Sequence, residues 1–240
     1  MDLQLNNRVV LVVGGSGTLG SVVVDRLAAE GATVVSASRS GGTNQVANGK
    51  GTATERVSSL TLDASDDVSV AAGMRDVIAR HGRLDAVVVT AAPAANTLDA
   101  SRKSDPDQVA EAIANKSLVF LRVANAAIPN MREAGFGRIV AINGQNAYLT
   151  GNVTNAVRNA ALIVIAKNLA DELAGTGVLI NTVNPGLVTT TPKAEVEMGR
   201  GGESTPQQIA DLVAFLASPL SAISGESIAI GHRALGSTVL

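Results

Sequence analysis

The chain has 240 residues and a formal net charge of −2 at pH 7, and it contains no cysteine. This length is typical of one α/β domain with a core large enough to fold without disulfides. The charge balance and the aromatic content of 2% argue against nucleic acid as a partner, because phosphate binding needs clustered cations and base stacking needs aromatic rings.

The sequence also argues against a metal centre and a membrane span. His81 and His232 lie far apart in the chain and have no ligand-like neighbours, so no metal site is expected. Apolar runs such as Val9–Val13 are far shorter than the roughly 20 residues that a membrane-spanning helix needs. The N-terminus carries no charged-then-apolar signal segment. We therefore expect a soluble, cytoplasmic protein without a membrane partner.

Short β-branched runs alternate with longer helical patterns along the whole chain. The strand patterns predict strands at residues 8–13, 32–37, 57–62, 84–89, 138–143, 178–183 and 227–230. The helical patterns predict helices at residues 18–30, 66–80, 106–132, 154–173 and 206–217. Apolar strands that alternate with helices favour an α/β fold with a doubly wound, mostly parallel sheet of about seven strands and helices on both faces.

A glycine-rich turn directly follows the first predicted strand and opens the first helix. Its Gly15-x-Gly17-x-x-Gly20 pattern lets a pyrophosphate approach backbone N–H groups at the positive end of that helix. The alternative interpretation is a turn that serves only tight packing of strand against helix. The pattern favours one dinucleotide-binding domain over residues 1–240, with cofactor contacts from Gly14, Ser16, Gly17, Thr18, Leu19 and Gly20.

The end of the second predicted strand indicates which dinucleotide is held. An acidic residue there would bind a ribose 2′-hydroxyl, but this chain has Ser38 and Arg39 and no acid. A guanidinium can pair with a 2′-phosphate, so NADP(H) is favoured over NAD(H). The alternative is a surface arginine without a ligand.

Later segments carry a resemblance to a known family over nearly the whole chain. They are Asp63-Ala64 after the third strand, Ala91-Ala92 after the fourth, Asn115 in the long helix, and Pro185-Gly186-Leu187-Val188-Thr189-Thr190 after the sixth. With the glycine turn, they resemble the short-chain dehydrogenase/reductase family, which has a Rossmann-like fold. The resemblance implies that Asp63 and Ala64 lie at the adenine, and that Ala91 and Ala92 lie at the cofactor. It also implies that Asn115 holds a water of the proton relay, and that Pro185, Gly186, Val188 and Thr190 pack on the nicotinamide.

The catalytic positions depart from the family pattern. The family's Tyr-x-x-x-Lys falls on Asn155 and Asn159, and its serine falls near Asn143-Gly144, so the resemblance places no acid or base there. An amide has no proton to give near neutral pH. Tyr148 is the one tyrosine of the chain and a candidate substitute acid, although such a tyrosine can simply cover apolar surface.

Other polar side chains are candidates for the vacated roles. Lys116 and Lys167 are candidates for a displaced amine, but lysines on helix faces are usually solvated. Carboxamides can hydrogen-bond a substrate or polarise a carbonyl. They can also cap helices, which is the interpretation we prefer for Asn152. The pocket is therefore expected to be rich in carboxamides: Asn115, Asn143, Gln145, Asn146, Asn152, Asn155 and Asn159.

Three functions remain open from the sequence. The first is an NADP(H)-dependent oxidoreductase of a small-molecule substrate, with a divergent proton relay. The second is a non-catalytic NADP(H)-binding protein, either a sensor or a partner subunit, and the third is a non-redox enzyme on the same scaffold. We expect the loop at about residues 187–203 to cover the substrate. The resemblance implies a homodimer or homotetramer, formed through the helices at residues 106–132 and 154–173.

Overall fold

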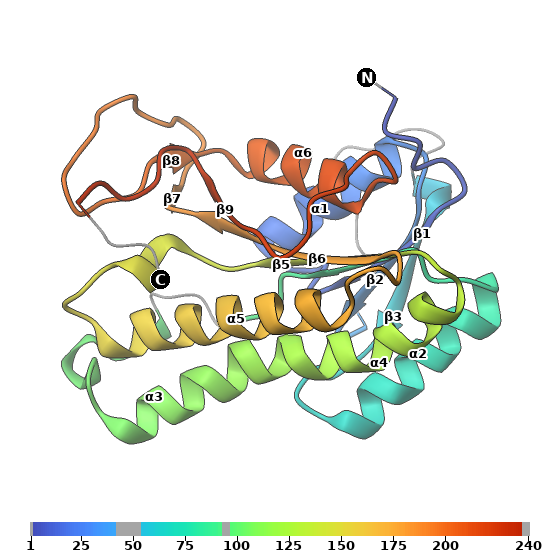
Figure 1. Ribbon diagram of the computed structural model, residues 1–240, viewed down its shortest axis with the longest axis horizontal. Helices are drawn as coiled ribbons and strands as arrows, with labels where there is room; N and C mark the ends of the chain where they lie inside the picture. The colour runs from blue at the N-terminus through green and yellow to red at the C-terminus, as the bar shows by residue number, and fades with distance from the viewer. Residues whose placement is uncertain (1, 42–53, 93–96, 237–240) are drawn as a thin grey trace.

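The computed structural model describes residues 2–41, 54–92 and 97–236 (Figure 1). Its centre is a sheet of seven parallel strands in the order β3-β2-β1-β4-β5-β6-β9. This confirms the predicted doubly wound, mostly parallel sheet. The strands are β1 (Val9–Val13), β2 (Thr33–Ser38), β3 (Val57–Thr61), β4 (Ala86–Val89), β5 (Gly137–Ile142), β6 (Val178–Pro185) and β9 (Ser227–Ile230).

The strand order reverses at β1, which pairs with β2 on one side and with β4 on the other. Val13, the last residue of β1, is in register with Ala37 and with Val89. In open α/β sheets, ligands bind in the crevice outside the carboxyl ends of the strands at such a reversal. The fold therefore places a candidate site beside the turn that follows Val13.

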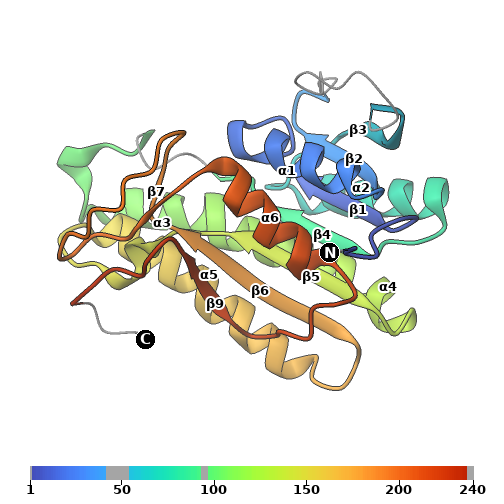
Figure 2. The same cartoon turned by 90° about the horizontal axis from the view of Figure 1, so that it is seen from above.

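Helices cover both faces of the sheet, as the two views show (Figures 1 and 2). On one face lie α1 and α6; on the other lie α2, α4 and α5, with α3 leading into α4. The helices are α1 (Thr18–Ala29), α2 (Asp67–His81), α3 (Pro106–Ile113), α4 (Val119–Glu133), α5 (Val153–Glu172) and α6 (Pro206–Ala217). Short 3-10 turns lie at Thr54–Arg56, Ala100–Arg102 and Gln145–Tyr148.

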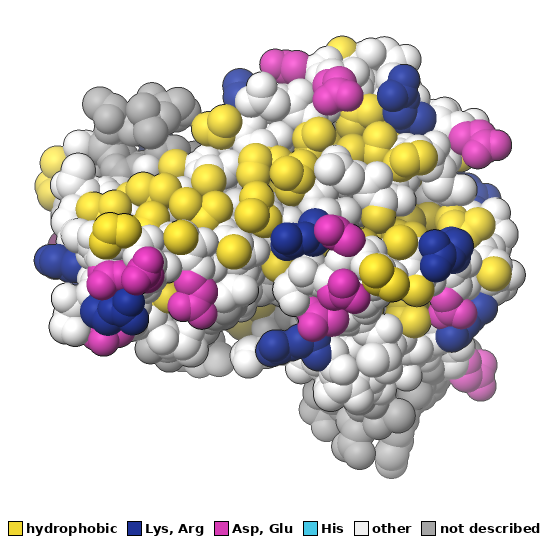
Figure 3. Space-filling view, turned by 90° about the horizontal axis from the view of Figure 1, so that it is seen from below, with side chains coloured by type: hydrophobic (Ala, Val, Ile, Leu, Met, Phe, Trp, Pro, Cys, Tyr) yellow, Lys and Arg dark blue, Asp and Glu magenta, His cyan; other side chains and the backbone are white. Residues whose placement is uncertain are grey.

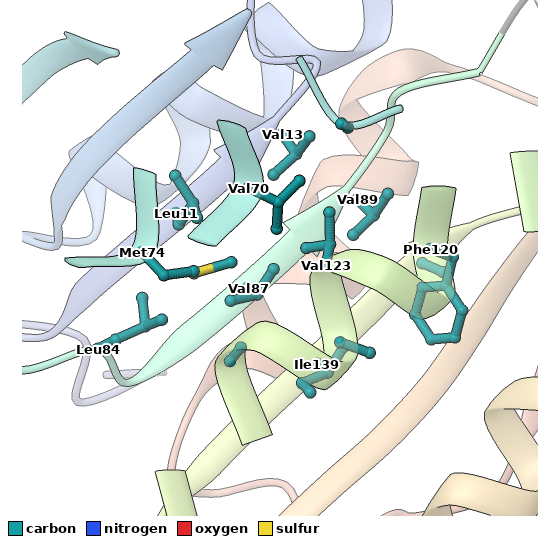
Figure 4. Packing of buried hydrophobic residues seen from close by; sticks show 14 of the residues in the cluster. Leu11, Val13, Val70, Met74, Leu84, Val87, Val89, Phe120, Val123 and Ile139 are labelled. Atoms are coloured by element: carbon teal, nitrogen blue, oxygen red, sulfur yellow. The ribbon is translucent and has the colours of Figure 1, made fainter. Parts of the chain in front are cut away.

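Alternate residues of the strands face two separate apolar cores. Leu11 and Val13 of β1 pack with α2 and α4, whereas Val10 and Val12 pack with α1 and α6. Figure 4 shows Leu11, Val13 and Val87 of the sheet beneath the helical side chains of the first core. Such strands are buried on both faces, which explains why the sequence shows them as continuous apolar runs.

The predicted helix 106–132 is interrupted in the structure. After α3, the segment Ala114–Leu118 is π-helical, and α4 then begins at Val119. A π-helical turn inserts one extra residue per turn and is frequent at functional sites. This segment, called the π segment below, carries Asn115.

The expected substrate loop contains a small second sheet. β7 (Leu187–Val188) pairs in parallel with β8 (Glu203–Ser204), and the residues between them are mostly exposed. Gly202 N donates to His232 O at 2.7 Å, so the C-terminal tail lies against this loop. Within the described ranges, no helix has both the length and the hydropathy to cross a membrane.

Candidate functional site

A cavity of about 690 Å³ opens at the carboxyl ends of β1 to β4, where the strand order reverses. It brings together residues from five separate parts of the sequence. Ten of the predicted cofactor and relay residues line it: Gly14, Ser16, Gly17, Ser38, Arg39, Asp63, Ala64, Ala91, Ala92 and Asn115.

The glycine turn fits tightly beneath this cavity. Gly14 has φ +87, and a Cβ there would lie 2.7 Å from Ala91 N. A Cβ on Gly20 would lie 2.1 Å from Gly14 O. Gly17 N donates to Gly14 O at 3.0 Å and closes the turn. The glycines therefore allow the start of α1 to approach β1 and the segment after β4.

The N-terminus of α1 is suited to hold an anion. Gly17 is its N-cap and offers no side chain to the first-turn N–H groups, and the first turn contains no acidic residue. The positive end of the helix dipole and its free donors therefore face outward beside Ser16 and Gly17, which line the cavity. Leu19, in contrast, packs against the second apolar core rather than toward the cavity.

Arg39 and Asp63 form the far wall of the cavity, at the ends of β2 and β3. Arg39 is exposed. The pKa of Asp63 lies below its ordinary value, because the Ser65 hydroxyl and N–H donate to the carboxylate and because the positive charge of Arg39 acts on it. The wall thus combines one accessible guanidinium with a carboxylate that stays ionised.

Asn155 and Asn159 lie together on α5 but do not line the cavity that the described residues form. Asn159 is buried, and its Nδ2 donates to Asn155 O at 2.9 Å. Asn155 N donates to the Oδ1 of Asn152 at 3.0 Å, which confirms Asn152 as the cap of this helix.

Two buried carboxamide oxygens near the helix start have no hydrogen-bond partner in the described part of the chain. They are the Oδ1 atoms of Asn143 and Asn155. The Nδ2 of Asn143 donates to Asn159 O at 3.1 Å and to the Oδ1 of Asn184 at 2.9 Å. Buried polar atoms are rarely left unpaired, so these two oxygens can accept hydrogen bonds from a ligand or a water molecule.

The expectation that Lys116 is solvated is wrong. Lys116 is 6% exposed, and its Nζ donates to the Oδ1 of Asn159 at 2.5 Å. Burial, and second to it the nearby Arg158 cation, lower its pKa to about 7. The helical period could have indicated this, because positions three, four and seven residues further on are the apolar Val119, Phe120 and Val123. Lys167, the other candidate amine, is exposed.

The expectation for Gln145 is also wrong. Its carboxamide holds the C-terminal tail instead of lining the cavity: Nε2 donates to Ile230 O and His232 O, and Oε1 accepts from Ala234 N at 2.8 Å. For Tyr148 the structure describes the backbone, at the end of a 3-10 turn, but the side chain lies outside the described residues.

The predicted nicotinamide segment follows β6, the strand next to β5. Pro185 is buried at the end of β6, and a Cβ on Gly186 would lie 2.4 Å from Gly202 O, so this turn packs against the end of the substrate loop. Val188 and Thr190 are exposed. None of these four residues lines the cavity as the described residues form it.

Fold and cavity together define a dinucleotide-binding α/β protein. The family model for short chain dehydrogenase matches residues 8–200. The chain therefore belongs to the short-chain dehydrogenase family, whose members bind nicotinamide cofactors.

Relatives match over almost their full length. One is the (2S)-[(R)-hydroxy(phenyl)methyl]succinyl-CoA dehydrogenase subunit BbsC of Thauera aromatica, which is 31% identical over 95% of this chain and 94% of its own. Another is the 3-oxoacyl-[acyl-carrier-protein] reductase FabG of Escherichia coli, 30% identical over 94% of this chain and 96% of its own. Among solved structures, gox2181 superposes with a TM-score of 0.78 at 27% identity, covering 95% of this chain and 96% of its own. YwfH, an NADPH-dependent reductase involved in bacilysin biosynthesis, superposes with a TM-score of 0.76 at 25% identity, covering 93% of this chain and 98% of its own.

The residues present fit a nicotinamide dinucleotide. The turn at Gly14 and Gly20 leaves no room for a Cβ, and the uncapped N-terminus of α1 offers donors to a pyrophosphate. The cavity continues from there to Arg39 and Asp63 on one side and to Asn115 on the other.

Proposed function

We propose that the protein is an NADP(H)-dependent oxidoreductase with a divergent proton relay, and that it acts on a small carbonyl, alcohol or enone. The observation that carries this proposal is the cavity at the strand-order reversal, with an uncapped helix N-terminus at its base and an accessible guanidinium on its wall. YwfH, similar in structure, is described as NADPH-dependent, which supports the same choice of cofactor.

Each part of the chain has a proposed role toward the cofactor. The N–H groups at Ser16 and Gly17 hold the pyrophosphate, and Arg39 pairs with the 2′-phosphate. Asp63 and Ala64 contact the adenine, and the segment from Pro185 to Thr190 covers the nicotinamide. When bound, the cofactor supplies the hydride chemistry, so the protein's task is to bind, orient and polarise.

Proton transfer is the divergent part of this proposal. Asn143, Gly144, Asn155 and Asn159 carry no group that exchanges a proton near neutral pH. We therefore assign the proton to Tyr148 or to a water molecule held by Asn115 and the free oxygen of Asn143 or Asn155. The carboxamides orient that water and the substrate oxygen.

A non-catalytic NADP(H)-binding protein is the second candidate, and one observation favours it. The positions that would carry the proton relay are tied to one another by internal hydrogen bonds, from Asn143 to Asn159 and from Asn159 to Asn155. BbsC is described as one subunit of a dehydrogenase, which is consistent with a partner-subunit role.

Turnover distinguishes the two candidates. The experiment follows NADPH oxidation against a panel of ketones, aldehydes, enones and a 3-oxoacyl thioester, the last chosen because of the FabG similarity. Oxidation that depends on one acceptor class supports the oxidoreductase, and its loss in Tyr148→Phe assigns the proton to Tyr148. Tight binding of NADPH without oxidation by any acceptor contradicts the oxidoreductase hypothesis and supports a non-catalytic NADP(H)-binding protein.

We also propose that the chain acts as one domain and assembles into a homodimer or homotetramer through α3, α4 and α5. A cytoplasmic location stays a prediction.

A further inference from the structure

Lys116 is the buried lysine of the described chain, since Lys103, Lys167 and Lys193 are all exposed. Its Nζ donates to the Oδ1 of Asn159 at 2.5 Å. Across the described ranges, no carboxylate lies within ion-pair distance of this amine. A buried amine that has only a carboxamide as partner is costly, so its presence calls for a role.

The π segment places this amine directly behind the wall of the cavity. Asn115 and Val119, on either side of Lys116 in the sequence, both line the cavity. The side chain between them reaches across to α5 instead. The π segment therefore contributes residues to the cavity wall and also makes a buried hydrogen bond to α5.

From Asn159, hydrogen bonds continue into the sheet. Asn159 O accepts from the Nδ2 of Asn143, which also donates to the Oδ1 of Asn184 at the end of β6. The amine thus anchors one end of an amide network that spans α5, β5 and β6. Removal of the amine leaves the buried Oδ1 of Asn159 without its donor.

The amine also changes charge in the neutral range. Its pKa is about 7, first because of burial and second because of Arg158 on α5, which is itself 4% exposed. The other charged side chains on the helices packed around it are exposed or half-buried and do not act on it: Asp107 and Glu111 on α3, Arg122, Arg132 and Glu133 on α4, and Lys167, Asp171 and Glu172 on α5.

We propose that Lys116 is a positioning residue of the dinucleotide site: it anchors the carboxamide of Asn159 from the neighbouring helix, and its charge strengthens the hold on an anionic cofactor. This inference rests on the proposed NADP(H) site. An anionic ligand binds the protonated form better, so affinity is highest below the pKa of Lys116 and falls as the pH rises through it.

The first readout is the titration of the amine itself. The chain has five lysines, so lysine labelled at the ε carbon gives few NMR signals, and Lys116→Met identifies the signal of Lys116. We expect this signal to titrate at about pH 7, far below those of the exposed lysines. A Lys116 signal that titrates together with the exposed lysines overturns the proposal.

The second readout is the dissociation constant of NADPH at about pH 6 and about pH 8. The chain has no tryptophan, so the fluorescence of the cofactor can be followed directly. For each protein, the ratio of the dissociation constants at the two pH values is measured. Dividing the wild-type ratio by the ratio for Lys116→Met removes the effect of the cofactor's own phosphate, which titrates in both experiments. After this division, the wild type should bind roughly threefold to tenfold more tightly at the lower pH. Lys116→Arg keeps its charge and should bind tightly at both values.

Lys167→Met is the matched control, because it removes an exposed lysine from α5 and should keep the wild-type pH dependence. Equal pH dependence in the wild type and Lys116→Met overturns the role of Lys116 but leaves the proposed function standing. Failure of the wild type to bind NADPH at either pH overturns both. Circular dichroism checks the folding of each variant, and if Lys116→Arg does not fold, the NMR titration and Lys116→Met still decide.

Discussion

At the scale of single residues, Arg39 is the side chain on which the choice of dinucleotide depends. It is exposed at the end of β2, on the wall of the cavity, and its charge acts on Asp63 across that wall. We expect Arg39→Ala to weaken NADPH binding about tenfold or more, the size of one charge-assisted hydrogen bond, and to leave NADH binding nearly unchanged. Titration of both cofactors measures this.

Arg75→Ala serves as the control for that comparison. Arg75 is an exposed arginine on α2 that lies outside the cavity, so its loss should change neither affinity. Equal weakening of NADPH and NADH by Arg39→Ala would mean that the guanidinium does not read the 2′-phosphate.

The burial of Lys116 leads to a prediction about how the free energy of unfolding depends on pH. Its pKa is about 7 in the folded protein and 10.5 as the ordinary value, so between these two values the unfolded chain binds more protons. The free energy of unfolding therefore rises with pH in this window, by about 2 kcal/mol from about pH 7 to about pH 9. Urea unfolding of the wild type should show this rise, and Lys116→Met should lack it. Identical pH slopes in the two proteins would show that the folded amine titrates normally.

At the scale of elements, the surroundings of α5 determine whether the family's Tyr-x-x-x-Lys motif can be restored at positions 155 and 159. Asn155→Tyr with Asn159→Lys would put a second amine where the Nζ of Lys116 already contacts position 159. Two close cations in a buried site repel each other, and Arg158 adds a third. We expect the double variant to be less stable than the wild type, and the triple variant with Lys116→Leu to recover stability.

The same triple variant should gain NADPH-dependent reductase activity of about a hundredfold over the wild type, the lower range of what a general acid contributes. Activity equal to that of the wild type in a folded, NADPH-binding triple variant would mean that the site has diverged beyond these three positions.

The glycine turn separates two effects that a substitution can have. A Cβ on Gly20 would lie 2.1 Å from Gly14 O, whereas a Cβ on Gly17 would lie 3.3 Å from the same atom. Gly20→Ala should therefore lower the free energy of unfolding by about 1–3 kcal/mol and also weaken NADPH binding. Gly17→Ala should weaken binding with a smaller loss of stability, because among the described residues its Cβ meets only Gly14 O and because Gly17 lines the cavity at the N-terminus of α1. Urea unfolding and NADPH titration are the two measurements. A larger loss of stability in Gly17→Ala than in Gly20→Ala would contradict this prediction.

At the scale of the whole molecule, the sheet could be predicted from the sequence and part of the site could not. The seven strands follow from apolar runs bounded by glycines and polar residues, and the glycine turn has a pattern that depends only on local geometry. Lys116 was misjudged because its burial depends on the distant Asn159 and Arg158 of α5. Gln145 was misjudged because its partners lie about ninety residues further on, in the tail. The distant partners of both side chains leave no local signal, although the apolar residues on the helical face of Lys116 do indicate that it is buried.

The face opposite α1 and α6 carries the proposed contact between subunits. Figure 3 shows apolar side chains spread over this face, which α2 to α5 cover. On α5, Val157 is 38% exposed and Val164 is 57% exposed. We expect Val157→Lys with Val164→Lys to reduce the oligomer to a monomer in light scattering, because charges at an apolar contact are left unpaired.

Val68→Lys is the control for the surface, since Val68 is 74% exposed and belongs to α2, which is not one of the helices of the proposed contact. It should leave the mass unchanged. A wild type that is monomeric at micromolar concentration would remove the proposed contact.

The most direct test of the central claim is a titration of the wild-type protein with NADPH and with NADH, read through the fluorescence of the cofactors. The cavity, the uncapped helix and Arg39 predict saturable binding of both, with NADPH about tenfold tighter or more. Absence of saturable binding for both cofactors, or tighter binding of NADH, would contradict the account.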